Sequence, residues 1–114
     1  MLLDNFTLIT EPTRLFITLR ENCITFSKQA LDEMGEPTYV LTYVREEERL
    51  AAFVKGEDGS ELTAVNGKMR RICDVRIIKR LKKLAGITDC GKGIRFYGEV
   101  KEGILIIDLQ QESI

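Results

Sequence analysis

The side chains best suited to chemistry are basic, and they are concentrated in one segment of the chain. Residues 68–83 contain eight Lys or Arg and a single acid, Asp74, which gives the segment a net charge of +7. Residues 1–67 and 84–114 are acidic, at −6 and −2, so the near-neutral total of −1 conceals a segregated charge distribution. Cationic side chains neutralise backbone phosphates. The residues expected to bind nucleic acid are Lys68, Arg70, Arg71, Arg76, Lys79, Arg80, Lys82 and Lys83, with Arg20 and Lys28 as minor contacts.

Four of these cations are spaced to share one face of a helix. Arg76, Lys79, Arg80 and Lys83 lie three or four residues apart, and like charges at that spacing repel by roughly 0.2–0.5 kcal/mol per pair. A bound anion would relieve this repulsion. Two alternatives stay open, a solvated face or internal neutralisation by the acidic runs at 46–48 and 57–58.

The acidic loops support a second hypothesis. Their carboxylates could imitate a row of phosphates for a nucleic-acid-binding protein, or form a charged rim for docking on a protein. Solvated turns are the simpler interpretation. The acidic residues concerned are Glu46, Glu47, Glu48, Glu57, Asp58 and Glu61.

Several kinds of chemistry are excluded or unsupported. The chain has no histidine, so imidazole bases and imidazole metal ligands are impossible. Cys23, Cys73 and Cys90 form no C-x-x-C pair and are too few for a tetrahedral zinc site or a disulfide framework. We therefore expect a non-enzymatic protein without metal or cofactor in a reducing compartment, the cytoplasm. No apolar run approaches the ~18 residues that a spanning helix needs, and no secretory signal is evident, so we expect no membrane contact.

Local sequence signals predict a mainly β domain with two short helices, an α+β fold. The 114 residues suit one domain. Tyr39, Tyr43 and Phe53 recur at strand spacing and are expected in the core. Expected strands cover 15–20, 61–65 and 69–75, expected hairpins pair 38–44 with 49–55 and 94–100 with 104–109, and expected helices cover 28–34 (capped by Ser27, ended by Gly35) and 76–85 (ended by Gly86).

The two halves of the chain follow the same outline. The half-repeats would be residues 14–55 and 69–109, joined by a loop at 56–68. Two such units packed face to face would form a barrel or a tight sandwich. Identity is slight, so both a duplication and a chance match stay open. A shift of fifty positions places Cys23 on Cys73, Leu31 on Leu81 and Met34 on Leu84, and an insertion of five then places Leu41 on Phe96, Glu47 on Glu102 and Leu50 on Leu105.

Residues 17–35, ITLRENCITFSKQALDEMG, followed by the hairpin at 39–55, resemble the AbrB/MazE/SpoVT swapped-hairpin family. The resemblance covers 15–55 well and 69–109 loosely. It implies a swapped-hairpin barrel and a transcription regulator that binds double-stranded DNA through basic side chains on each turn and short helix. A chain with two units would be a monomeric pseudo-dimer, and a chain with one unit would be a homodimer. The sequence departs from the family at Glu21-Asn22-Cys23, where Gly-Arg is typical, and at Leu31 and Asp32, where basic residues are common.

Two functional hypotheses follow. The first is a DNA-binding regulator that contacts phosphates through residues 68–83. The alternative is a phage or mobile-element protein that binds and inhibits a host protein through its charged loops.

Overall fold

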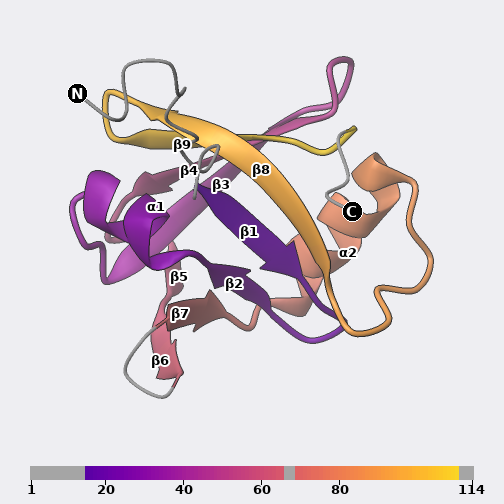
Figure 1. Ribbon diagram of the computed structural model, residues 1–114, viewed down its shortest axis with the longest axis horizontal. Helices are drawn as coiled ribbons and strands as arrows, with labels where there is room; N and C mark the ends of the chain where they lie inside the picture. Colours follow the sequence, from indigo (N-terminus) through magenta and orange to yellow (C-terminus); the bar gives the residue numbers. More distant parts are fainter. Residues whose placement is uncertain (1–14, 66–68, 111–114) are drawn as a thin grey trace, which may run out of the picture.

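The fold is mainly β with two short helices, as the sequence predicts (Figure 1). The computed structural model describes residues 15–65 and 69–110. Within this part, the helices are α1 (Lys28–Glu33) and α2 (Val75–Ala85). The strands are β1 (Phe16–Leu19), β2 (Ile24–Phe26), β3 (Tyr39–Arg45), β4 (Leu50–Lys55), β5 (Ser60–Glu61), β6 (Thr63–Val65), β7 (Met69–Ile72), β8 (Ile94–Lys101) and β9 (Ile104–Asp108).

The strands form one nearly closed, barrel-like sheet. Its order is β5-β3-β4-β9-β8-β1-β2-β7-β6, with antiparallel neighbours throughout. The two outermost strands, β5 and β6, follow one another along the chain and are separated by Leu62 alone. The expected strand at 61–65 is therefore divided at Leu62, whose amide donates to the Thr38 carbonyl at 2.9 Å. This segment pairs with β3 on one side and β7 on the other, and so brings the two ends of the sheet together.

The core lies inside this sheet and under both helices. Phe26 from β2 and Phe53 from β4 meet edge to face, with ring centroids 5.0 Å apart, and both are fully buried. The expectation that Tyr39 and Tyr43 belong to the core is wrong, because they are 38% and 57% exposed. Side chains alternate between faces along a strand, so burial of Val40 at 0% exposure turns both tyrosines outward on β3.

The pairing scheme is the same when the two halves are exchanged. Each half runs strand, strand, helix, hairpin, and the β8–β9 hairpin lies between β4 and β1, so strands of both halves alternate around the sheet. Exchanging β2 with β7, β3 with β8, β4 with β9, and β1 with the divided β5–β6 segment leaves the order of neighbours unchanged.

The residue matches expected from a fifty-residue shift are not those of the structure. Cys23 is buried whereas Cys73 is exposed, and the helix caps Ser27 and Asp74 correspond at a spacing of 47. In the hairpins, burial matches Val40 with Phe96 and Ala51 with Leu105, each one residue away from the expected alignment. The β8–β9 turn is two residues shorter than the β3–β4 turn, and sequence identity alone did not reveal this difference.

Within the described residues, neither helix is long and apolar enough to cross a membrane. The same part of the chain holds no group of three or more His, Cys, Asp or Glu side chains placed to bind a metal ion.

Candidate nucleic-acid interface

Helix α2 carries most of the expected cations, and its ends are set by local signals. The Asp74 side chain caps the helix by accepting from the Arg76 amide at 3.0 Å. The helix ends at Gly86, whose φ of +73° is a left-handed conformation that glycine adopts without strain. The first helical residue is Val75, one position before the expected start.

The apolar side of α2 determines which cations face outward. Ile78 and Leu81 are buried, and Ile77, Leu84 and Ala85 pack against the core as half-buried neighbours. Helical periodicity then turns the remaining side outward. The exposed cations on that side are Arg76, Lys79, Arg80 and Lys83.

Two of these four cations have carboxylate partners in the fold. Arg80 forms an ion pair with Glu46, which lies in the turn between β3 and β4. Arg76 Nε lies 3.7 Å from Asp74 Oδ1 while its side chain is 93% exposed. Lys79 and Lys83 form no ion pair with any described residue. Internal neutralisation of this face is therefore partial.

Lys82 points away from this face and binds the body of the protein. Its Nζ lies 2.8 Å from Glu21 Oε2 in the β1–β2 turn, and Glu21 Oε1 accepts from the Cys90 amide at 2.6 Å. These bonds, first to Lys82 and then to the Cys90 backbone, lower the pKa of Glu21 to about 2. The bond to Glu21 raises the pKa of Lys82, and burial raises the pKa of the Cys90 thiol. Lys82 thus anchors α2 rather than standing free for a ligand.

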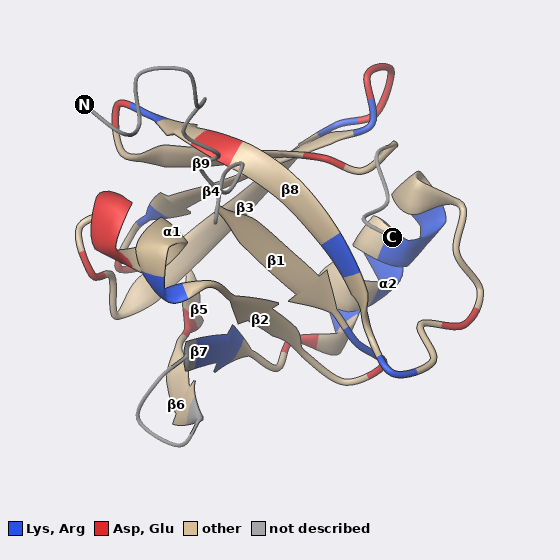
Figure 2. Cartoon of the chain, viewed as in Figure 1, with Lys and Arg blue, Asp and Glu red and all other residues tan. Residues whose placement is uncertain are grey.

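The other expected contacts do not gather on α2. Arg70 donates to the Pro37 carbonyl at 3.0 Å, and Arg71 is exposed on the neighbouring position of β7. Arg20 donates to the Lys92 carbonyl at 2.9 Å, and Lys28 is exposed in the first turn of α1. Figure 2 shows the blue segments of α2 at the right of the view, away from those of α1 and β7 at the left. Lys68 lies outside the described residues.

The structure adds a cation that the sequence did not single out. Arg49, in the β3–β4 turn, lines a cleft of about 540 Å³ together with Glu46, Arg80, Lys83 and Leu84. It reaches this position with a left-handed backbone, φ +54°. In the sequence Arg49 directly follows the acidic run at 46–48 and begins an expected strand. The packing of the turn beside α2 places Arg49 with Arg80 and Lys83.

All six acidic residues are exposed, and two of them have arginine partners. Glu46 pairs with Arg80, and Glu48 pairs with Arg45 at 3.2 Å. The remaining members, Glu47, Glu57, Asp58 and Glu61, are exposed. The turn at 46–48 is therefore not a free row of carboxylates.

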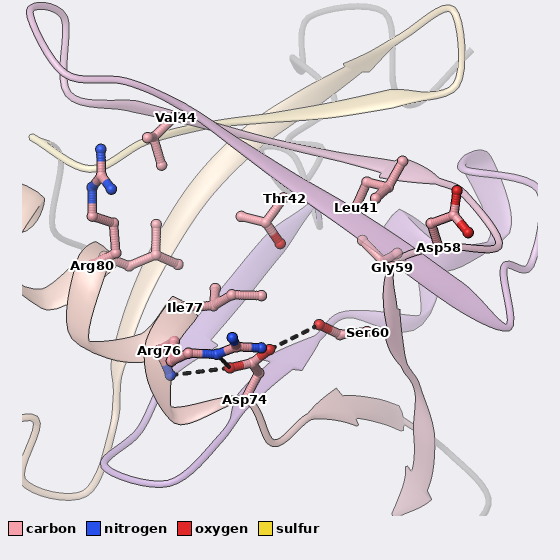
Figure 3. Close-up of a pocket in the computed structure, with 12 residues that line it drawn as sticks. Leu41, Thr42, Val44, Asp58, Gly59, Ser60, Asp74, Arg76, Ile77 and Arg80 are labelled. Atoms are coloured by element: carbon pink, nitrogen blue, oxygen red, sulfur yellow. Dashed lines mark hydrogen bonds and ion pairs between the residues drawn. The ribbon is translucent and has the colours of Figure 1, made fainter.

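A second cleft, of about 550 Å³, lies between β3 and α2 (Figure 3). Asp74 and Ser60 are joined across one end by a 3.4 Å hydrogen bond. The Thr42 hydroxyl oxygen is buried in its wall, with no hydrogen-bond partner among the residues that the structure describes. Figure 3 shows Arg80 extending toward the Val44 end of the cleft, whereas Arg76 lies beside Asp74 at the other end.

Comparison with known proteins does not assign the chain to a family. No family model, curated protein or solved structure matches it. The resemblance of residues 15–55 to swapped-hairpin regulators stays a prediction from the sequence.

Proposed function

We propose that this protein binds double-stranded DNA, without catalysis, through phosphate contacts made by the outer face of α2. The observation that carries the proposal is the exposure of Arg76, Lys79, Arg80 and Lys83 together on one face of an 11-residue helix. From Arg76 to Lys83 this face extends about 10 Å at 1.5 Å per residue. Arg49 continues it onto the β3–β4 turn.

The balance of charge favours an anionic ligand. Of the five cations on this surface (Arg49, Arg76, Lys79, Arg80 and Lys83), two form ion pairs with described residues, Arg80 with Glu46 and Arg76 with Asp74. Both ion pairs involve exposed arginines, and exposed pairs are weak and easily exchanged. The role of transcription regulator comes from the family resemblance, which implies DNA as the partner.

The test is duplex binding measured as a function of salt. A fluorescent 20-base-pair duplex of random sequence is titrated with wild type, with K79Q/K83Q, and with the control K55Q/K101Q, which removes the same charge from exposed strand positions. Losing two phosphate contacts should reduce the slope of log K against log salt by about 1.8. The control should keep the wild-type slope. Absence of wild-type binding at ~50 mM salt would overturn the proposal.

We also infer that the barrel is an internally duplicated, swapped-hairpin-like pseudo-dimer. The exchangeable pairing scheme and the interleaved hairpins support this inference. A chain that supplies both units has no need of a partner copy to complete the sheet, so sedimentation should give a monomer. A stable dimer would contradict it.

The alternative, inhibition of a host protein through the acidic loops, has less support. Two of the three glutamates in the β3–β4 turn already have arginine partners. It stays a prediction for the exposed carboxylates Glu47, Glu57, Asp58 and Glu61.

A further inference from the structure

We propose that the cleft between α2 and the β3–β4 turn is a seat for one backbone phosphate, and that Glu46 occupies this seat in the free protein. The inference rests on the proposed DNA-binding function and names a specific contact within it. The cleft holds about 540 Å³, many times the roughly 10–15 Å³ of such space that one water needs. A hydrated phosphate group therefore fits.

The cations of the cleft come from two separate elements. Arg80 and Lys83 project from successive turns of α2, and Arg49 comes from the facing turn. An anion between them would be held from two sides. Arginine is suited to this task because its planar fork donates two parallel hydrogen bonds to phosphate oxygens.

Glu46 already places an anion at this position. Its carboxylate pairs with Arg80, and the two side chains are 63% and 58% exposed. A carboxylate offers the same two-oxygen edge to a guanidinium that a phosphate offers. Because the pair is exposed, water screens it, and a phosphate can displace it at little cost.

Phosphodiester is favoured over an acidic peptide as the ligand. The cleft carries three cations against one carboxylate, and exposed cations continue along α2 to Lys79 and Arg76. A duplex presents phosphates at regular intervals. When one phosphate binds in the cleft, the next phosphates along the strand would therefore lie beside Lys79 and Arg76.

The first experiment compares E46Q with E47Q in the duplex titration. The two glutamates are adjacent, both exposed, and carry the same charge, but only Glu46 lines the cleft. E46Q should raise duplex affinity by about 1.4- to fivefold, the range over which an exposed ion pair contributes. E47Q reports the general gain from removing one negative charge, and its increase should be smaller.

The second experiment compares R49Q with R45Q. Arg45 is four residues away, pairs with Glu48 and does not line the cleft. R49Q should lower affinity and reduce the salt slope by about 0.9, the value of one phosphate, whereas R45Q should keep the slope. Glutamine, like arginine, is unbranched at Cβ, so R49Q should add no backbone strain at this left-handed position.

The outcomes separate the seat from the function. Duplex binding with equal gains for E46Q and E47Q, or an unchanged slope for R49Q, would overturn the seat and leave the DNA-binding function standing. Failure of the wild type to bind duplex would overturn the function. In that case the phosphate seat is tested by titrating wild type and E46Q with inorganic pyrophosphate. Binding is measured by NMR from the shifts of the Arg49 and Arg80 Nε–H signals. Tighter pyrophosphate binding by E46Q supports the seat, and equal binding overturns it. If E46Q binds polyglutamate more tightly than duplex, the assignment of the cleft to a phosphate ligand is wrong.

Discussion

The two helices hold corresponding places in the two halves of the barrel, yet they present opposite surfaces. Both are capped by a side-chain oxygen and both bury apolar residues: Ala30 and Leu31 in α1, Ile78 and Leu81 in α2. The exposed residues of α1 are Lys28, Gln29, Asp32 and Glu33, whereas those of α2 include four cations. The scaffold therefore fixes only the inward side of each helix. The outward side is free to carry function, and only α2 carries a concentration of positive charge.

The largest expected effect tests whether α2 is as fully integrated as α1. Leu81 and Leu31 are 0% and 6% exposed, and truncating a buried leucine to alanine costs about 2–5 kcal/mol. L81A and L31A should each lower the free energy of urea-induced unfolding by an amount in that range. A loss below about 1 kcal/mol for L81A alone would show that α2 contributes little to the core. It would contradict the view that both helices are packed equally well.

Removing the N-cap should cost more stability in α1 than in α2. Ser27 is 3% exposed, and its hydroxyl accepts from the Ala30 amide at 3.3 Å and from the Phe16 amide at 3.2 Å. S27A leaves the buried Ala30 amide and the part-buried Phe16 amide without this acceptor, and we expect it to cost about 1–3 kcal/mol. Asp74 caps α2 from a more exposed position, so D74A should cost about 0.5–2 kcal/mol. Thermal melting of both variants measures the difference. A larger loss for D74A would contradict this order.

The smallest effect concerns the Lys82–Glu21 anchor of α2, for which α1 has no counterpart among the ion pairs of the described residues. Bonds to Lys82 and to the Cys90 amide hold the pKa of Glu21 at about 2, below its ordinary value of 4.5. A lowered carboxyl pKa stabilises the fold above pH 4.5 and ceases to do so as the pH falls toward 2. E21Q should thus melt below wild type at pH 7, and the gap should narrow between pH 4.5 and 2. The control E33Q, on the exposed side of α1, should match wild type throughout. A gap for E21Q that does not change with pH would argue against the anchor.

Local signals made much of the fold predictable. Ser27 and Gly86 cap the helices as predicted, whereas α1 ends at Glu33, one residue earlier than predicted, with Met34 as its C-cap before Gly35. The β-rich runs around short turns predicted both hairpins. Capping and periodicity act over a few residues, which is why these elements could be read directly from the chain. The sequence pattern did not predict which face of β3 is buried. Tyr39, Leu41 and Tyr43 make one face of that strand as apolar as the other.

The sequence by itself determined the class of fold and the outward row of cations on α2. Only the tertiary structure decided which cations are available to a ligand. Lys82 meets a glutamate 61 positions away, Arg80 meets one 34 positions away, and Arg49 joins α2 from the far end of a hairpin. Charge pairing depends on distance in space, and the strand pairing of the nearly closed sheet sets those distances between residues remote in the chain.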